Sequence, residues 1–178
     1  WKNRERYVKT YYAPYNKNPN STDWRDWPYM AGDAAVISSD GYVRILGRVD
    51  DVINVAGHRL GTKEIESAAL TVEEVAEAAV VSVHDEVKGT IPDLYVSLKP
   101  GEEPTEELAK KISGAVSEVV GKIARPAHVY IVADMPKTRS GKIMRRILAS
   151  ISNRKDVGDV MTLANPHIVE EIRQQVQG

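Results

Sequence analysis

The apolar positions of this chain follow two periods, which predict strands in some segments and helices in others. Short continuous apolar runs, typical of buried strands, lie at 52–55, 78–83, 94–98 and 129–132. Helical spacing relates three sets of apolar residues: Ile65, Ala68 and Ala69; Leu108, Ile112, Val116 and Val119; and Ile143, Ile147 and Ile151. From about residue 50 the order is hairpin, helix, strand, strand, helix, strand, loop and helix. This order predicts a small α+β domain with a short sheet and helices packed on it.

Polar residues mark the expected starts of these helices. Thr62 and Thr105 precede the first two, where a hydroxyl can accept a hydrogen bond from the first turn. Asn165-Pro166 predicts the start of a last helix, because Asn caps well and Pro is tolerated at the first helical position. We expect Lys142 at the start of the helix that carries Ile143, Ile147 and Ile151.

The first 46 residues differ from the rest of the chain. They carry all three Trp residues and many turn-forming residues, which predicts an irregular aromatic stretch. A Ser-Asp-Gly turn then joins expected strands at 34–38 and 42–46. This segment does not obviously close a core of its own. The chain also lacks an initiator Met, so we expect a segment of a longer protein.

Composition narrows the classes of function. A net charge of -1 gives no global field that attracts nucleic acid or anionic lipid. The absence of cysteine excludes disulfides, thiolate ligands and cysteine nucleophiles, and fits a cytoplasmic location. The four histidines are scattered without metal-ligand spacing, so no metal site is expected. No segment approaches the roughly 20 apolar residues of a membrane span, and the charged N-terminus does not resemble a signal peptide.

Gly32-Asp33 is the first of three polar or glycine-rich segments that are candidates for chemistry. Glycine lets a backbone approach a ligand closely, and the neighbouring carboxylate can accept hydrogen bonds from two ribose hydroxyls. An ordinary turn is the alternative, because the Gly-Asp pair is common in turns.

The second segment, 47–66, contains two arginines and a pair of aspartates. The planar guanidinium groups of Arg48 and Arg59 suit phosphate or ribose oxygens. Asp50 and Asp51 interrupt an apolar stretch at a cost in strand propensity. They indicate either a hinge or a solvated turn.

The third segment, "PKTRSGK" at 136–142, is a basic loop with proline and glycine that presents Lys142. A lysine suits negative charge that develops on phosphate or carboxylate oxygens. The phosphate-cradling string G-x-x-x-x-G-K-[ST] is absent. The alternative is a basic surface or nucleic-acid patch made of Lys137, Arg139, Lys142, Arg145 and Arg146. The net charge and the acidic stretches 73–77 and 102–107 argue against nucleic acid.

In this order and spacing, the three segments resemble the closing motifs of the adenylate-forming superfamily, which includes acyl-CoA synthetases, luciferases and nonribosomal peptide adenylation domains. The strings "GRVDDVINVAGHRLGT" and "MPKTRSGKIMRRIL" are similar to the acetyl- and propionyl-CoA synthetase branch, as is the tail "VGDVMTLANPHIVEEI". The resemblance covers nearly the whole chain. It implies a mobile C-terminal domain with a small mixed sheet and flanking helices at 50–178. A β-rich remnant of the large N-terminal domain would occupy 1–49.

The resemblance also implies roles for matching residues. Asp33 would hold the ribose hydroxyls of the adenylate, Arg48 would contact the ribose–phosphate region, and Arg59 would contact phosphate. Asp50 would be the hinge, and the loop around Gly57 would line the path of the coenzyme A thiol in the second half-reaction.

Lys142 would be the catalytic lysine of the first half-reaction, bridging the acid carboxylate and ATP. The implied ligands are ATP and AMP, Mg²⁺ bound with ATP mainly by the missing domain, acetate and coenzyme A. The implied reaction converts ATP, acetate and coenzyme A to acetyl-CoA, AMP and pyrophosphate through acetyl-adenylate. Propionate or another short-chain acid is an alternative substrate.

One position departs from the family pattern. Members often carry an Arg that contacts the nucleotide end of coenzyme A, and that position falls on Ser117. Either another cation takes over or coenzyme A binds more weakly. The nearest basic residues are Lys110, Lys111, Lys122 and Arg125.

The large domain of the superfamily, with its phosphate loop and its adenine and acyl pockets, is missing from these 178 residues. We therefore expect this large domain as a partner and no complete reaction by the chain alone. A different interpretation is a free-standing regulatory module. In that case a protein acetyltransferase and a sirtuin-type deacetylase would act on Lys142, because acetylation removes its charge.

Overall fold

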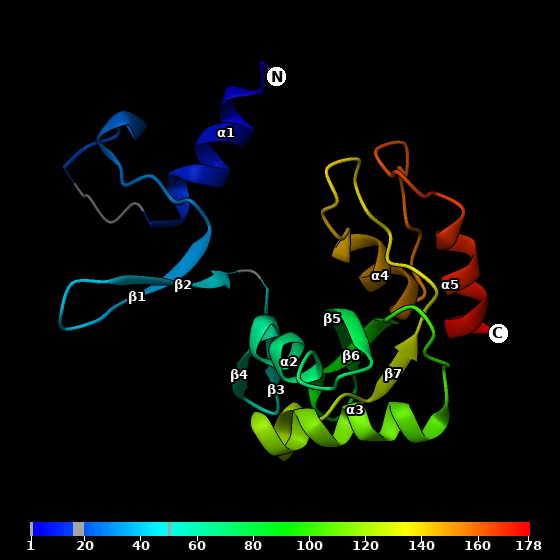
Figure 1. Ribbon diagram of the computed structural model, residues 1–178. Helices are drawn as coiled ribbons and strands as arrows, with labels where there is room; N and C mark the ends of the chain where they lie inside the picture. Colours follow the sequence, from blue (N-terminus) through cyan, green and yellow to red (C-terminus); the bar gives the residue numbers. More distant parts are fainter. Residues whose placement is uncertain (1, 16–19, 50) are drawn as a thin grey trace. The chain divides into compact units, whose positions relative to one another are not determined.

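The computed structural model describes residues 2–15, 20–49 and 51–178 (Figure 1). The chain divides into two compact units, Trp1–Asp51 and Val52–Gly178. Asp50, the expected hinge, lies outside the described residues.

The described part of the first unit contains a helix, two 3-10 turns and a two-stranded antiparallel sheet. These elements are α1, Arg4–Tyr11; η1, Ala13–Tyr15; η2, Trp24–Asp26; β1, Asp33–Ile37; and β2, Val43–Arg48. The two strands confirm the predicted hairpin to within two residues at each end. The irregular structure expected before them is wrong for α1, whose first turn is capped by the Asn3 side chain accepting a hydrogen bond from the Arg6 N–H at 3.0 Å.

Aromatic side chains hold the helical part of this unit together. Tyr12 packs edge-on against Trp24 with ring centroids 5.0 Å apart, and Tyr11 stacks on Tyr29 at 5.7 Å. Offset and edge-to-face pairs of this kind are favourable for aromatic rings. Contacts between tyrosine and tryptophan rings therefore join α1 to η2. Neither element contains a buried residue.

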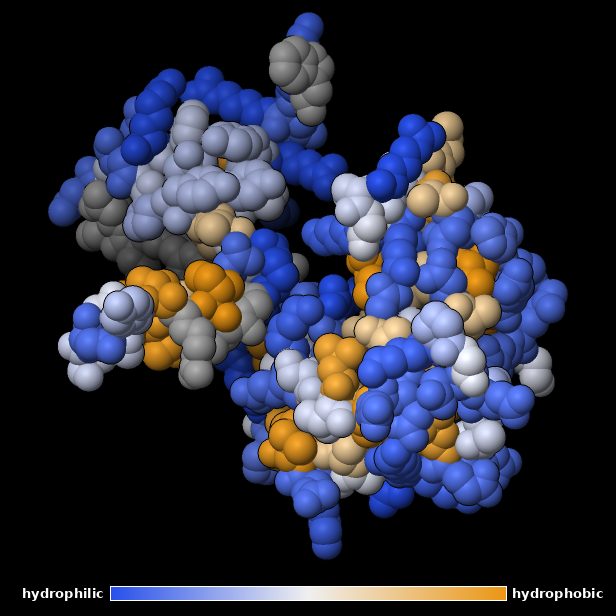
Figure 2. All heavy atoms as spheres, in the orientation of Figure 1, coloured by the Kyte–Doolittle hydropathy of each residue, from blue (hydrophilic) through white to orange (hydrophobic). Residues whose placement is uncertain are grey.

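The β1–β2 hairpin exposes many apolar side chains (Figure 2). Between 44% and 77% of the residue surface is exposed at Val36, Ile37, Tyr42, Val43 and Ile45. An isolated two-stranded hairpin is marginally stable in water. An apolar hairpin that lacks a core on either face is typical of a piece of a larger sheet.

The second unit is built on a mixed five-stranded sheet. Its strands are β3, Val52–Val55; β4, His58–Gly61; β5, Val75–Asp85; β6, Gly89–Leu98; and β7, His128–Ile131. The order is β4-β3-β6-β5, and β7 pairs with β6. The β6–β7 pairing is parallel and the others are antiparallel. The predicted α+β class with a small mixed sheet and flanking helices is confirmed.

Helices cover both faces of this sheet (Figure 1). They are α2, Thr62–Ala69; α3, Glu106–Val119; α4, Arg145–Ser152; and α5, Ile168–Gln177, with a 3-10 turn η3 at Lys122–Ala124. Leu94 and Val96 of β6 pack with α2 and α3, while Tyr95 packs with α4 and α5. Because both faces are buried, the central strands appear in the sequence as continuous apolar runs.

Two of the predicted helix signals differ from the structure. Thr105 caps α3 as expected, accepting a hydrogen bond from the Leu108 N–H at 3.1 Å. Thr62, however, is the first residue of α2 and not its cap, and its buried hydroxyl has no hydrogen-bond partner among the described residues. Val119 was expected on the apolar stripe of α3 but is 62% exposed, because it lies in the last turn beyond the sheet-facing residues.

The start of α4 and the start of α5 are also later than predicted. Lys142 lies before α4, which begins at Arg145, so it is a loop residue. α5 begins at Ile168 with His167 as its N-cap, so Asn165 does not cap it. The Lys142 N–H instead donates to Thr138 within the loop. The Asn165 side chain instead bonds to residues 134–137, in the loop ahead of α4. Within residues 2–15, 20–49 and 51–178, every helix is too short or too polar to cross a bilayer.

Candidate functional site

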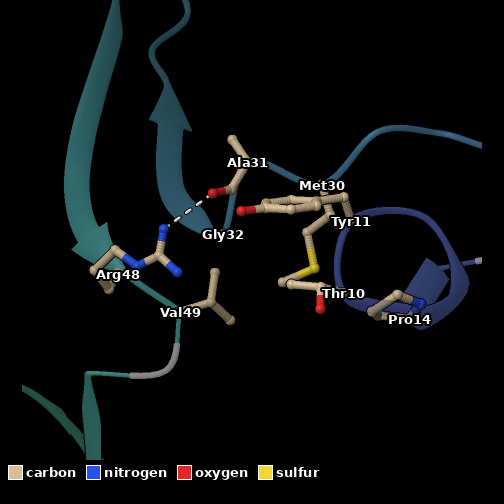
Figure 3. A pocket seen from close by; sticks show the side chains of 8 residues that line it. All are labelled: Thr10, Tyr11, Pro14, Met30, Ala31, Gly32, Arg48 and Val49. Carbon is tan, nitrogen blue, oxygen red and sulfur yellow. Dashed lines mark hydrogen bonds between the residues drawn. The ribbon is translucent and has the colours of Figure 1, made fainter. Parts of the chain in front are cut away.

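In the first unit, the structure brings Asp33 and Arg48 together. They are directly opposite each other at the open end of the β1–β2 hairpin. The Arg48 Nη1 donates to the Ala31 carbonyl at 3.0 Å (Figure 3). The same nitrogen lies 3.6 Å from Asp33 Oδ1. Asp33 keeps 44% of its side chain exposed and Arg48 keeps 47%, so both can still reach a ligand.

Gly32 is buried beneath this guanidinium and adopts a φ of 83°. A Cβ atom at this position would lie 2.6 Å from Arg48 Nη2, far inside van der Waals contact. Glycine is therefore required here both for the backbone conformation and for the close approach of Arg48.

A pocket of about 370 Å³ opens beside this pair (Figure 3). Its walls come from α1 and η1 on one side and from the ends of β1 and β2 on the other. The lining residues are Thr10, Tyr11, Pro14, Met30, Ala31, Gly32, Arg48 and Val49. Largely apolar walls with a guanidinium at the rim suit a ligand that combines a ring with an anionic group.

The β3–β4 hairpin carries the two predicted site residues Gly57 and Arg59. Val55 pairs with His58, so Ala56 and Gly57 form a two-residue turn with φ values of 49° and 85°. Positive φ at both turn residues matches the twist of the flanking strands. Gly57 and Arg59 are exposed, and the hairpin presents them to solvent.

Lys142 lies in a second, smaller hairpin that precedes α4. Lys137 pairs with Ile143 in an antiparallel bridge that closes the loop. The Thr138 N–H donates to the Lys142 carbonyl at 2.9 Å, and the Lys142 N–H donates to Thr138 Oγ1 at 3.1 Å. The backbone of Lys142 is therefore held on both sides while its side chain is exposed.

The base of this lysine hairpin (137–143) is tied to the rest of the unit by Lys137. Its ammonium group lies 2.7 Å from Glu77 Oε2 and 2.9 Å from Asp134 Oδ1. Hydrogen bonds to Glu77 and Asp134 raise the pKa of Lys137 above its usual value. Burial alone would raise the pKa of Asp134, but hydrogen bonds from Lys137, the Met135 N–H and Asn165 lower it overall. Both groups therefore keep their charges near neutral pH.

Most cations near the lysine hairpin have structural partners. Arg145 makes a bidentate ion pair with the buried Glu66 at 2.8 to 2.9 Å. Arg146 donates to the carbonyls of Val157 and Asp159. Within the described part of the chain, the cations of this cluster that make no ion pair or hydrogen bond through their side chains are Arg139 and Lys142. A nucleic-acid patch of five free cations is therefore not what this segment forms.

The two candidate segments of the second unit, the β3–β4 hairpin and the lysine hairpin, lie apart. In Figure 1 the β3–β4 hairpin and the loop ahead of α4 project from separate parts of this unit. Asp33 and Arg48 belong to the first unit and pair with each other there. The sequence-predicted residues thus fall into three local groups: Asp33 with Arg48, Gly57 with Arg59, and Lys142.

Ser117, the position at which the resemblance led us to expect a contact with coenzyme A, makes a hydrogen bond within α3. Its hydroxyl donates to the Ser113 carbonyl at 2.9 Å, and Arg125 Nε donates to Ser113 Oγ at 3.3 Å. Lys111 is paired with Glu74 at 2.6 Å. Of the basic residues considered from sequence, Arg125 is the one bonded to the turn of α3 that precedes Ser117.

The roles of two residues that hold the lysine hairpin were missed from the sequence. Thr138 bonds the backbone of Lys142, and Asn165 bonds the backbone at the base of the hairpin. The threonine four residues before a lysine in a glycine-containing turn was a usable signal. The signal at Asn165 was misleading because an Asn-Pro pair also predicts a helix cap. Among the described residues, no group of three or more His, Cys, Asp or Glu is placed to hold a metal ion.

Comparison with known proteins identifies the second unit. Residues 64–142 match the family model of the AMP-binding enzyme C-terminal domain. Over 98% of its length the chain is 47% identical to an acetyl-coenzyme A synthetase of Pyrobaculum arsenaticum, and over 99% it is 48% identical to that of Phycomyces blakesleeanus. It spans about a quarter of the length of these relatives, covering 24% and 25% of them.

The solved structures agree. The chain is similar to the crystal structure of the anthranilate CoA ligase AuaEII in complex with anthranoyl-AMP, with a TM-score of 0.64 and 32% identity. The match covers 71% of this chain and 24% of that one. The resemblance noted from the sequence motifs is thereby confirmed. Over residues 64–142 the chain matches the AMP-binding enzyme C-terminal domain family, and over nearly its whole length it is similar to acetyl-coenzyme A synthetases.

Proposed function

We propose that the chain is the C-terminal part of an AMP-forming acetyl-CoA synthetase. The observation that carries this proposal is Lys142, an exposed lysine on a hairpin whose backbone is fixed by Thr138. It belongs to a chain that is 47% and 48% identical to proteins described as acetyl-coenzyme A synthetases. A preorganised cation of this kind is suited to charge that develops on phosphate and carboxylate oxygens.

In this proposal residues 1–49 are the end of a large N-terminal domain, and residues 50–178 are a mobile domain hinged at Asp50. The division of the chain after Asp51 supports a boundary in this region. The exposed apolar faces of the β1–β2 hairpin support a larger sheet that covers it. The large domain is then the chain's principal partner and supplies the remaining part of the site.

The first half-reaction forms the adenylate. An oxygen of the acetate carboxylate bonds to the α-phosphorus of ATP, the bond from that phosphorus to the bridging β-phosphate oxygen breaks, and pyrophosphate leaves. Mg²⁺ bound with ATP would neutralise part of the phosphate charge and would be held mainly by the large domain. Lys142 neutralises the charge shared between carboxylate and phosphate. Asp33 accepts hydrogen bonds from the ribose hydroxyls, and Arg48, 3.6 Å away, contacts the ribose–phosphate region. Positioning and charge neutralisation are the main contributions of the protein to such a step.

The second half-reaction transfers the acetyl group. The thiol sulfur of coenzyme A bonds to the acyl carbon, the bond to the AMP oxygen breaks, and the thiol proton passes to solvent. The domain rotates at Asp50, so that the Gly57 turn replaces Lys142 and Arg59 contacts phosphate. The two hairpins project from separate parts of the second unit, which supports an alternation in which two orientations of the domain present them in turn.

A reversible modification of Lys142 follows from its exposure. Within the described residues its side chain makes no hydrogen bond or ion pair and is exposed, so a protein acetyltransferase and a sirtuin-type deacetylase would be able to reach it. Acetylation would remove the positive charge and with it the first half-reaction. The cysteine-free composition supports a cytoplasmic location for these encounters.

The intact protein that contains this chain tests the proposal. Acetate- and propionate-dependent release of pyrophosphate and formation of the acyl-CoA are measured in parallel. We expect ATP- and acetate-dependent pyrophosphate release with acetyl-CoA as product, and no sustained turnover by the isolated chain. Propionate as the better substrate would move the proposal to the other short-chain acid. Absence of any carboxylate-dependent pyrophosphate release would overturn it.

A further inference from the structure

We propose that Asn165 is a positioning residue for Lys142, fixing the base of the lysine hairpin from the C-terminal segment. This inference rests on the proposed function of Lys142. The Asn165 side chain makes three hydrogen bonds, all of them to the segment that leads into the hairpin. Oδ1 accepts from the Lys137 N–H at 3.0 Å, and Nδ2 donates to Asp134 Oδ2 and to the Met135 carbonyl, each at 2.8 Å.

Residues beside Asn165 add backbone bonds at the same place. The Ala164 N–H donates to the Lys137 carbonyl at 2.8 Å, and Leu163 pairs with Thr138 as an isolated bridge. Lys137 is thus bonded through both its N–H and its carbonyl to the segment 163–165. The first strand of the hairpin is held by a segment that lies 25 to 28 residues later in the sequence.

The bonds run from Asn165 to Lys142 in three steps. Asn165 fixes Lys137, the Lys137–Ile143 bridge closes the hairpin, and Thr138 holds the backbone of Lys142. Lys142 is exposed, so the direction of its side chain depends on the backbone that carries it. Loss of the Asn165 side chain leaves the Lys137 N–H, the Met135 carbonyl and Asp134 without this partner and loosens the hairpin at its base.

Asn165 would act through Lys142 and therefore only in the half-reaction that uses Lys142. Small displacements of a catalytic group cost large factors in rate, because proximity and orientation supply much of the barrier reduction. A merely structural asparagine would weaken both half-reactions in proportion to the loss of folded protein. The separate measurement of the two half-reactions therefore distinguishes a positioning role from a structural one.

The chain offers a matched control in Asn153. Its Oδ1 accepts from the His84 N–H at 3.1 Å, and its Nδ2 donates to the Ser82 and Ala149 carbonyls at 3.0 and 2.8 Å. Both asparagines are half-buried and make one accepted and two donated hydrogen bonds. Asn153 joins α4 to β5, whereas Asn165 joins the C-terminal segment to the lysine hairpin.

The experiment compares Asn165→Ala with Asn153→Ala in the intact protein. Adenylate formation is followed as pyrophosphate release in single turnovers, and thioester formation is followed from supplied acetyl-adenylate and coenzyme A. We expect Asn165→Ala to slow adenylate formation about 10-fold with little change in thioester formation. Asn153→Ala should lower the melting temperature similarly and leave the ratio of the two rates at the parent value. Equal loss in both half-reactions, or the same ratio in both variants, would overturn the positioning role.

A double variant separates this inference from the proposed function. If Asn165 acts through Lys142, adding Asn165→Ala to Lys142→Ala should cause no further loss of adenylate formation. A further 10-fold loss contradicts the inference while Lys142 keeps its role. If Lys142→Ala by itself leaves adenylate formation intact, the proposed function fails instead.

Discussion

Thr138 holds the backbone of Lys142 from both sides. The Thr138 N–H donates to the Lys142 carbonyl at 2.9 Å, and Thr138 Oγ1 accepts from the Lys142 N–H at 3.1 Å. The Gly141 N–H closes the same turn on the Thr138 carbonyl at 2.9 Å, and Gly141 has a φ of 80°. Thr138 and Gly141 thus fix the backbone of one exposed lysine by local bonds, before any contact with a ligand.

Removing the Thr138 hydroxyl should impair Lys142 specifically. Thr138→Val keeps the shape of the side chain but leaves the Lys142 N–H without its acceptor. We expect adenylate formation by the intact protein to fall about 10-fold, with thioester formation from supplied acetyl-adenylate nearly unchanged. Thr138→Ser keeps the hydroxyl and should retain most of the rate. A serine variant as slow as the valine variant would show that the hydroxyl is not the important group.

The contact of Arg48 with Gly32 predicts a strong effect of one methyl group. A Cβ at Gly32 would lie 2.6 Å from Arg48 Nη2, so Gly32→Ala must displace the guanidinium. We expect the dissociation constant for AMP, measured by calorimetry on the intact protein, to rise at least about 10-fold. Gly41→Ala is the matched control, because Gly41 has a φ of 89° but no atom within 4 Å of the added Cβ.

Gly41→Ala should therefore carry the backbone strain without the clash. It should destabilise the hairpin by about 1 kcal/mol and leave AMP binding unchanged. Equal weakening of AMP binding by both alanines would attribute the effect to strain in the hairpin and not to Arg48.

Glu66 is a buried carboxylate that joins α2 to the start of α4. It accepts from Arg145 at 2.8 to 2.9 Å, from the Val80 N–H at 3.1 Å and from Lys63 at 2.8 Å, and only 3% of its surface is exposed. Glu66→Gln leaves Arg145 without its counter-charge. We expect a loss of about 3 kcal/mol in the free energy of unfolding, measured with urea.

The matched surface variant is Glu74→Gln. Glu74 is also paired with a lysine, Lys111 at 2.6 Å, but its side chain is 25% exposed and lies away from α4. Because exposed ion pairs contribute little, this variant should change the unfolding midpoint only slightly. A midpoint shift as large as that of Glu66→Gln would contradict the special role of the buried pair.

The ion pairs of Lys137 predict a dependence of stability on pH. The pKa of Lys137 is raised above its ordinary value of 10.5, chiefly by the hydrogen bond to Glu77 and then by that to Asp134. The stabilisation is therefore complete below about pH 10.5 and is lost as the pH rises through the higher folded-state pKa. The difference in urea midpoint between the parent and Lys137→Met should be constant from pH 7 to 9 and shrink above about pH 10.5.

Lys110→Met provides the comparison for this titration. Lys110 lies 3.8 Å from Glu106 and is 75% exposed, so its pair should contribute little at any pH. A Lys137→Met difference that stays constant across the alkaline range would show that the ammonium charge does not stabilise the fold.

The apolar pattern was sufficient to predict most of the second unit. Buried positions such as Ile65, Ile112 and Ile147 recur at helical spacing, and the central strands are continuous apolar runs. Strand ends were placed too far inside: β5 and β6 extend to Asp85 and Gly89, where polar residues continue the ladder. At these ends the strands are held by backbone hydrogen bonds between β5 and β6, and the apolar pattern of the side chains gives no sign of those bonds.

Polar residues were harder to interpret than apolar ones. Thr105 caps a helix, whereas Thr62 and Asn165 carry the same local signal and do not. The partners of Asn165 lie about 30 residues earlier in the chain. A sequence signal that is local cannot distinguish a cap from a side chain whose acceptors come from a distant loop.

The same limit applies to α1 and to the three groups of site residues. α1 is stabilised by aromatic contacts, for example between Tyr7 and Trp24 at 5.9 Å, and has no apolar stripe. Motif order placed Asp33 and Arg48 in one site, and strand register explains their pairing. Sequence could not show that Thr138 fixes Lys142, because that bond depends on the turn that forms around Gly141.

The most direct test of the central claim is the effect of Lys142→Ala on each half-reaction of the intact protein. Pyrophosphate release from ATP and acetate reports the first, and acetyl-CoA formation from supplied acetyl-adenylate reports the second. The account predicts that the first falls by at least about 100-fold while the second stays near the parent rate. If both half-reactions survive the substitution, or if both are lost together, Lys142 is not the lysine of adenylate formation and the account is contradicted.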